Sequence, residues 1–437
     1  MAAPLTLMEV PLGDLKPSPR NARMHSARQI KQIAASIEAF GFTNPVLVDE
    51  HNILVAGRGR LEAAKRLGMS EVPAIRVAHL SEAEKRALVL ADNKIAPNAG
   101  WDLDILASEL EALSSLDLEI NLTGLEVGEI DLIIQDQAGD QSTEPELAPL
   151  PDPTLPSIAR AGDVWLLGRH RVMCGDALSE TDLASLMQGD SADVGFADPP
   201  YNVPINGHVT GKGQVQHREF VQASGEMTEI EFADFLSRAL LLGAQHSRDG
   251  AAWFACMDWR HMGEMLAAGT QAFDEHLNLC VWAKTNGGMG SLYRSQHELV
   301  FVFRKGKAGH RNNVQLGRFG RNRTNLWTYP GLNTFREGRI EELVAHPTAK
   351  PVAMIKDALL DVSARGEIVL DPFLGAGATL MAAEDCGRIA CGLDLDPAYV
   401  DVTLRRWRSA TGEEPVRQRD GYTLEALEAD ANEEVAS

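Results

Sequence analysis

The chain of 437 residues lacks the features that mark secreted, zinc-binding and membrane-spanning proteins. Its five cysteines form no C-x-x-C pair and show no metal-ligand spacing, so the sequence predicts neither a disulfide scaffold nor a metal site. No apolar run approaches the roughly 20 residues that cross a bilayer, and the N-terminus has no signal-peptide core. We therefore expect reduced thiols, no membrane contact and a cytoplasmic location.

Positive charge is also scarce, because 41 Lys and Arg face 62 Asp and Glu and leave a net charge of −21. An acidic protein that binds nucleic acid must concentrate its basic residues locally, since phosphate contacts supply most of the affinity. One stretch does so. Residues 281–340 hold eleven Lys or Arg against Glu298 and Glu337, a balance of +9.

The most specific motif is the tetrapeptide of Asp198, Pro199, Pro200 and Tyr201. It follows the apolar residues 192–197, which predict a buried strand that ends in a loop, where open α/β sheets bind their ligands. The Asp198 carboxylate and the Pro199 carbonyl can accept both hydrogens of an exocyclic amino group, and Tyr201 can stack on a base that has left the duplex. The motif therefore predicts a site that holds an amino group while a methyl group is delivered to it.

A second motif joins a glycine turn to a distant carboxylate. Residues 367–379 read as strand, turn and helix start, and Asp394 ends the next predicted strand. Gly375 and Gly377 let the backbone approach a ligand closely, and an acid at position 394 can bond two ribose hydroxyls. Leu380 stands where a dinucleotide fingerprint has its third glycine, which favours an adenosyl ligand without a pyrophosphate. The alternative is a tight strand-to-helix connection with solvated acids.

Together these motifs resemble the amino-group DNA methyltransferases that use S-adenosylmethionine, over about residues 161–410. The order, with the catalytic motif first and the donor motif after a long insert, resembles the β-class arrangement. The resemblance implies a Rossmann-like α/β domain that acts on double-stranded DNA, with Asp198, Pro199, Pro200 and Tyr201 as catalytic residues. It implies that the methyl donor is bound by Asp176, Asp371, Phe373, Gly375, Gly377, Thr379, Asp394, His346, Lys350 and Pro351.

Within that set, the resemblance implies that Asp176 contacts the donor's adenine and that residues 346–351 line the methionine side. His346 and its neighbours can instead simply cap the helix that begins near Lys350. In the basic insert, Arg311, Arg318, Arg321 and Arg323 alternate with asparagines, residue types that read base edges, so we predict DNA contacts there. The alternative is a solvated basic loop.

The target base and the class of function have alternatives. The catalytic motif begins with Asp rather than the Ser more typical of cytosine-N4 relatives, so adenine N6 is the expected target and cytosine N4 the alternative. A DNA-binding or partition factor with a non-catalytic scaffold is disfavoured by the intact motifs. Methylation of RNA or of a protein amide is a third class, for which a motif that begins with Asn is commoner, and the basic insert favours DNA over protein. The recognition sequence, a partner restriction enzyme and the oligomeric state, a homodimer included, stay open.

The first hundred residues predict a separate α+β unit, in which a helical pattern stops at Gly41 and two short strands precede Gly57, Arg58, Gly59 and Arg60. This stretch resembles the N-terminal domain of ParB partition proteins and sulfiredoxins. In ParB proteins the corresponding box binds nucleotide phosphates, which implies CTP or ATP at Gly57, Arg58 and Arg60. The second nucleotide motif and the sulfiredoxin cysteine are missing, so a purely structural turn is the alternative.

The domain layout follows from these segments. We expect a ParB/sulfiredoxin-like domain over residues 1–100, a helical connector packed on it over 101–136, and a proline-rich acidic linker over 137–160. A methyltransferase domain with its recognition insert then spans 161–412, and residues 413–437 read as a frayed acidic tail.

Overall fold

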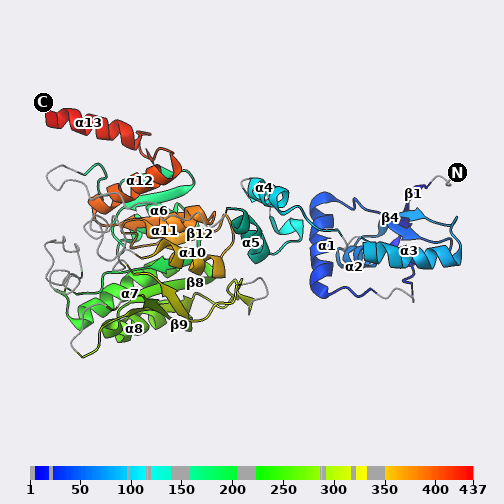
Figure 1. Cartoon of the computed structure of the whole chain (residues 1–437), viewed down its shortest axis with the longest axis horizontal. Coiled ribbons are helices and arrows are strands. Elements are labelled where there is room, and N and C mark those ends of the chain that lie inside the picture. Colours follow the sequence, from blue (N-terminus) through cyan, green and yellow to red (C-terminus); the bar gives the residue numbers. More distant parts are fainter. Residues whose placement is uncertain are drawn as a thin grey trace. The chain divides into compact units, whose positions relative to one another are not determined.

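A computed structural model of the chain describes residues 5–18, 23–95, 99–114, 116, 120–138, 157–203, 223, 225–285, 287, 292–315, 321–331 and 350–436 (Figure 1). The chain divides into two compact units, Met1–Gln137 and Ala138–Ser437.

The first unit is built on a four-stranded sheet of order β1-β4-β2-β3, with strands β1 (Leu7–Pro11), β2 (Val46–Val48), β3 (Leu54–Ala56) and β4 (Glu71–Arg76). Its helices are η1 (Leu12–Asp14), α1 (Ala27–Phe40), α2 (Arg58–Arg66) and α3 (Glu82–Ile95). Helix α1 ends as predicted at Gly41, whose φ of 78° is favourable only for glycine. The α+β class predicted for this unit is confirmed.

The predicted connector forms helices α4 (Leu103–Ser114), η3 (Ile120–Thr123) and α5 (Val127–Ala138). Leu110 packs against Ile130 and Ile134 in a small core of its own. This segment also contacts α1, because Gln32 donates to the carbonyl of Gly124 over 3.1 Å. An ion pair between Arg28 and Glu126 joins the same two segments, so the connector contacts α1.

The second unit contains a ten-stranded sheet of order β11-β9-β10-β8-β7-β12-β13-β6-β5-β14. The strands β8, β7, β12, β13 and β6 run parallel, and β9 and β10 add an antiparallel pair. The strands are β5 (Val164–Leu167), β6 (His170–Cys174), β7 (Ala192–Ala197), β8 (Ser247–Met257), β9 (Glu275–Lys284), β10 (His297–Arg304), β11 (Leu326–Tyr329), β12 (Ile368–Asp371), β13 (Ile389–Asp394) and β14 (Val416–Arg417).

Helices cover both faces of this sheet and enclose two hydrophobic cores. One core contains residues of α6 (Glu180–Met187), α7 (Glu229–Gln245) and α8 (Met262–Ala272), with η4 (Trp259–His261) beside α7, and the other contains residues of α10 (Val352–Val362), α11 (Ala378–Asp385) and α12 (Pro397–Thr411). This layering confirms the predicted Rossmann-like α/β class. Of the described helices, none is long and apolar enough to span a bilayer.

The structure corrects the prediction of a frayed acidic tail. Residues 416–417 form β14, which pairs with β5, and helix α13 (Leu424–Ala436) follows, with Leu424 completely buried. The acids of this segment have partners, since Glu428 accepts from Arg405 over 2.6 Å and from Arg408 over 3.0 Å. Within the predicted recognition insert over 281–340, β10, β11 and the end of β9 belong to the central sheet, and the recognition role of this segment stays a prediction.

Candidate active site

Four of the predicted site acids lie at the carboxyl ends of four neighbouring parallel strands. Asp198 follows β7, Asp371 ends β12, Asp394 ends β13, and Asp176 follows β6. The strands are adjacent in the order β7-β12-β13-β6. The carboxyl edge of a parallel sheet is where such folds bind ligands, and the structure therefore brings the two predicted motifs together at one site.

The glycine turn is held against Asp394. The amide of Gly375 donates to Asp394 Oδ2 over 3.0 Å, and the amide of Asp396 donates to Oδ1 over 2.8 Å. Gly377 is the N-cap of α11 with a φ of 77°, a left-handed conformation that glycine adopts at little cost. Burial raises the pKa of Asp394 to about 7 against the effect of the two amides. Each carboxylate oxygen can accept a second bond, which suits hydroxyl donors.

The remaining predicted donor residues lie at the ends of neighbouring elements. Asp371 accepts the Phe373 amide over 2.9 Å, and burial raises the pKa of Asp371 to about 7 although the Thr379 hydroxyl donates to it. Asp176 accepts the amide of Leu178 over 2.8 Å. Pro351 is the N-cap of α10. His346 lies outside the described residues.

Asp198 is held by two neighbours. The Lys350 ammonium lies 2.6 Å from Asp198 Oδ2, and the Tyr201 hydroxyl is 2.9 Å from Oδ1. Both partners also reach Glu298 Oε2, Tyr201 at 3.0 Å and Lys350 at 3.1 Å. Lys284 pairs with the other oxygen of Glu298. Lys350, which the resemblance assigns to the donor, therefore contacts the predicted catalytic carboxylate.

Burial and charge fix the protonation states of this cluster. Burial raises the pKa of Asp198 and outweighs the attraction of Lys350. Burial also acts to raise the pKa of Glu298, but Lys350 and Lys284 outweigh it and bring this pKa to about 2. Burial and the charge of Asp198 hold the pKa of Tyr201 far above its ordinary value. Glu298 is thus ionised and Tyr201 is a neutral donor at pH 7.

Sequence reasoning did not identify Glu298 and Lys284 as site residues. They lie near each other because β9 and β10 are antiparallel neighbours, with Glu298 opposite Trp282. The Trp282 ring also faces both ammonium groups, with centroid distances of 4.6 Å to Lys284 and 5.9 Å to Lys350. The strand pairing that creates this arrangement has no signature in the local sequence.

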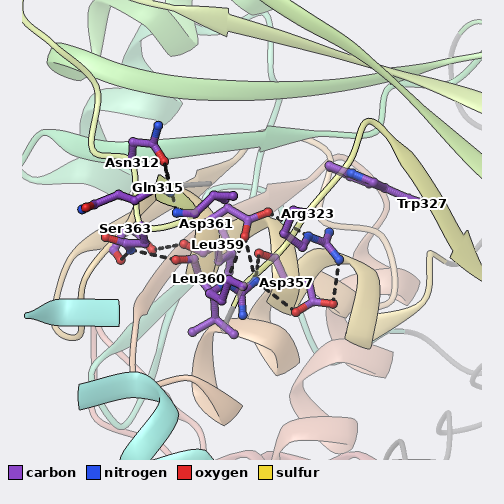
Figure 2. Close-up of polar contacts among 12 residues, drawn as sticks. Asn312, Gln315, Arg323, Trp327, Asp357, Leu359, Leu360, Asp361 and Ser363 are labelled. Carbon is purple, nitrogen blue, oxygen red and sulfur yellow. Dashed lines mark hydrogen bonds and ion pairs between the residues drawn. The ribbon is translucent and has the colours of Figure 1, made fainter. Parts of the chain in front are cut away.

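Where the structure describes the insert arginines that were predicted to contact DNA, they have acidic partners inside the second unit, and DNA binding by them stays a prediction. Arg321 lies 2.7 Å from one oxygen of Asp361 on α10. Arg323 lies 3.1 Å from the other oxygen of the same carboxylate (Figure 2). Arg311 pairs with Glu367 at 2.6 Å. The positive charge at these positions is neutralised inside the unit. Arg318 lies outside the described residues.

In the first unit, the predicted nucleotide box forms the start of α2. Gly57 is its N-cap with a φ of 98°, and Arg58 is its first residue. The Arg60 guanidinium donates to the carbonyls of Asn44 and Pro45, over 2.7 and 3.2 Å, and so ties the helix to the segment that leads into β2. This contact gives Arg60 a structural role, and nucleotide binding stays a prediction. Among the described residues, no group of three His, Cys, Asp or Glu has the geometry to hold a metal.

Comparison with known proteins gives three family matches along the chain. The N6/N4 DNA methylase family matches residues 192–405, the ParB N-terminal domain matches 3–94, and the ParB-methyltransferase HTH domain matches 104–161. The ParB-like nuclease domain-containing protein YnaK of Escherichia coli (strain K12) is 43% identical over 86 residues, 20% of this chain and 99% of YnaK.

Two further similarities concern the second unit. The type II methyltransferase M2.DpnII of Streptococcus pneumoniae is 27% identical over 236 residues, 51% of this chain and 84% of that protein. The crystal structure of the M1.HpyAVI–SAM complex aligns with 54% of this chain and 98% of its own, at 16% identity and a TM-score of 0.37.

The helix-turn-helix match covers a segment that sequence reasoning described only as a connector and a linker. The usual charge signature is missing, because the sequence between Lys94 and Arg160 contains no Lys, Arg or His. The acids there are Asp102, Asp104, Glu109, Glu111, Asp117, Glu119, Glu126, Glu129, Asp131, Asp136, Asp140, Glu144, Glu146 and Asp152.

Proposed function

Since this chain belongs to the N6/N4 DNA methylases, with a ParB N-terminal domain ahead of its methylase domain, we propose that it methylates adenine N6 in double-stranded DNA. S-adenosylmethionine is the methyl donor in this proposal. Adenine is preferred over cytosine N4 because the catalytic motif begins with Asp198 rather than Ser.

One observation carries the proposal. A buried carboxylate, Asp198, lies at the same sheet edge as the glycine turn of Gly375 and the ribose-type acid Asp394, on adjacent parallel strands. An amino group held by Asp198 would therefore lie close to a donor held by the turn. Holding two reacting groups at contact distance accounts for a large part of the rate in transfer reactions.

The residues around Asp394 offer partners for an adenosyl compound. Asp394 offers two carboxylate oxygens to the ribose hydroxyls, and the donors it already has are single backbone amides. Gly375 and Gly377 have positive φ angles of 54° and 77°, which let this tight turn form at the edge of the sheet. When bound, S-adenosylmethionine supplies an electrophilic methyl group on a positively charged sulfur.

The chain's own residues handle the amino group. The Asp198 carboxylate accepts one amino hydrogen and the Pro199 carbonyl the other, which localises the nitrogen lone pair toward the donor. The nitrogen bonds the methyl carbon as the carbon–sulfur bond breaks, and its surplus proton passes to Asp198. Burial raises the pKa of this carboxyl, which favours that proton transfer. Tyr201 supplies an aromatic face for the flipped base.

The test is radiolabel transfer from S-adenosylmethionine to duplex DNA with purified full-length protein. We expect Asp198→Asn to reduce the transfer rate by on the order of 10²–10³-fold, because one oriented acceptor is lost, while calorimetry shows unchanged donor binding. The matched control is Asp190→Asn, which removes a half-exposed carboxylate that pairs with Arg171 before β7. Full activity of Asp198→Asn would overturn the proposal.

The base assignment has its own readout. Hydrolysis of the methylated DNA to nucleosides, followed by mass spectrometry, separates N6-methyladenine from N4-methylcytosine. We expect the label in N6-methyladenine alone. Label in N4-methylcytosine would retain the amino-methyltransferase proposal and refute the adenine assignment.

A further inference from the structure

Both oxygens of Asp198 have partners before any base is bound. Lys350 lies on Oδ2 and the Tyr201 hydroxyl on Oδ1. In the proposed function the target amino group must donate to this carboxylate. Asp198 must also take up the surplus proton, which the Lys350 ammonium opposes while it lies on Oδ2, so Lys350 must move away. The Lys350 side chain is only 4% exposed, so water cannot receive its charge.

Glu298 is a second acceptor for both Lys350 and the Tyr201 hydroxyl. Its Oε2 lies 3.1 Å from the Lys350 ammonium and 3.0 Å from the Tyr201 hydroxyl. Both groups can therefore shift from Asp198 to Glu298 without crossing the site. A buried lysine with no partner would be costly, but here its charge stays paired throughout.

We propose that Glu298 is a positioning residue that receives Lys350 and the Tyr201 hydroxyl when the target amino group takes their place on Asp198. This inference rests on the proposed methyl transfer. Glu298 does not touch the base in this arrangement and acts through Lys350. The Lys350 ammonium thus moves from Asp198 to Glu298 and back during each catalytic cycle.

Lys284 keeps Glu298 ready for this exchange. Its ammonium pairs with Glu298 Oε1 and leaves Oε2 for Lys350. Two carboxylates and two ammonium groups share the cluster, which makes it formally neutral. The amide of Lys284 also donates to the carbonyl of Gln296 over 2.9 Å, so the β9–β10 pairing holds both residues of the Glu298 pair in place.

The decisive variant is Glu298→Gln. A neutral amide attracts Lys350 less than a carboxylate does, so Lys350 stays on Asp198 and competes with the target amino group. We expect methyl transfer to slow by on the order of 10²-fold, as for a misplaced reacting group, with donor affinity unchanged. The matched control is Glu275→Gln, at the opposite end of the same strand pair, where Glu275 pairs with Arg304.

A second variant separates exchange from a merely structural role. Lys350→Met in the Glu298→Gln background removes the competitor, so the double variant should transfer methyl groups faster than Glu298→Gln alone. A purely structural cluster predicts the reverse, since the second substitution would add damage. Should Glu298→Gln fail to fold, Glu298→Asp, whose carboxylate is withdrawn by one carbon, carries the same test.

The pH profile gives an independent readout. The charge of Glu298 raises the pKa of Asp198, so its removal should shift the acidic limb of the rate profile to lower pH. Tyr201, Cys256 and Asp371 also lie near Asp198 and are unchanged in the variant. An unshifted limb, or a double variant no faster than the single one, overturns the inference. Absence of transfer by the unmodified protein would instead refute the proposed function.

Discussion

Gly377 in the donor turn allows a quantitative test of the structure. It adopts a φ of 77°, and a Cβ added there would lie 2.8 Å from Thr403 Cγ2 and 3.0 Å from its Oγ1. Thr403 is fully buried and donates its hydroxyl to the carbonyl of Gly375 over 2.9 Å. Gly377→Ala therefore imposes a strained backbone and a clash, and the clash can be relieved only by moving the residue that holds the turn.

The two costs can be estimated separately. A left-handed conformation costs a non-glycine residue about 1–2 kcal/mol, and overpacking of a filled core costs about 1–3 kcal/mol. Gly377→Ala should thus lower the free energy of unfolding by about 2–5 kcal/mol. Gly412→Ala is the matched control, because Gly412 has a φ of 75° and no atom within 4 Å of the added Cβ. Its cost should be the backbone term alone, about 1–2 kcal/mol.

Chemical denaturation of the full chain measures the free energy of unfolding of the second unit in both variants. Thr403→Ser removes the closest atom but keeps the hydroxyl, so it should recover about 1 kcal/mol when combined with Gly377→Ala and nothing when combined with Gly412→Ala. Donor affinity, measured by calorimetry, should fall in Gly377→Ala only. Equal losses in the two alanine variants would refute the packing argument.

Two further predictions concern charge. Arg321→Ala removes a buried cation that pairs with Asp361, so it should lower the free energy of unfolding by up to about 3–5 kcal/mol. The salt dependence of DNA binding should stay unchanged. A reduced salt slope at normal stability would instead support a contact between Arg321 and DNA. Asp394 has a pKa raised to about 7, so its contribution to stability is complete below about pH 4 and is lost as the pH rises through 7. Ribose hydroxyls favour the ionised form, so donor affinity should increase from pH 6 to 8, and this dependence should weaken in Asp394→Asn; flat affinity in the unmodified protein would contradict it.

The sequence predicts those parts of the site that depend on short-range order. Residues 192–197 form β7 as the apolar run indicates, and Asp394 ends β13 where a ribose acid is expected. Each feature needs only a strand, a turn and the rule that parallel strands present their carboxyl ends at one edge. The glycine conformations at 375 and 377 follow from the same local logic.

Contacts across long sequence separations could not be predicted in this way. Lys350 reaches Asp198 across 152 positions, and nothing near either residue encodes the pairing. The charge count over 281–340 likewise stopped short of Asp361, which lies on the next helix and neutralises Arg321 and Arg323. The charges of a segment can be counted from its sequence. Their partners depend on how α10 packs against the segment, which the count does not include.

The segment that matches the helix-turn-helix family is negatively charged, as is the DNA that such motifs bind. Such motifs hold DNA largely through Lys and Arg contacts to phosphates, and acids near the backbone repel it within a Debye length of about 8–10 Å. Helices α4 and α5 lie in a stretch without a single basic residue, and one of its acids, Glu126, already pairs with Arg28 of the first unit. Phosphate affinity must therefore arise from the 41 Lys and Arg on either side of this stretch, and its acidic helices are suited to contacts with protein groups, as the pairing with α1 illustrates.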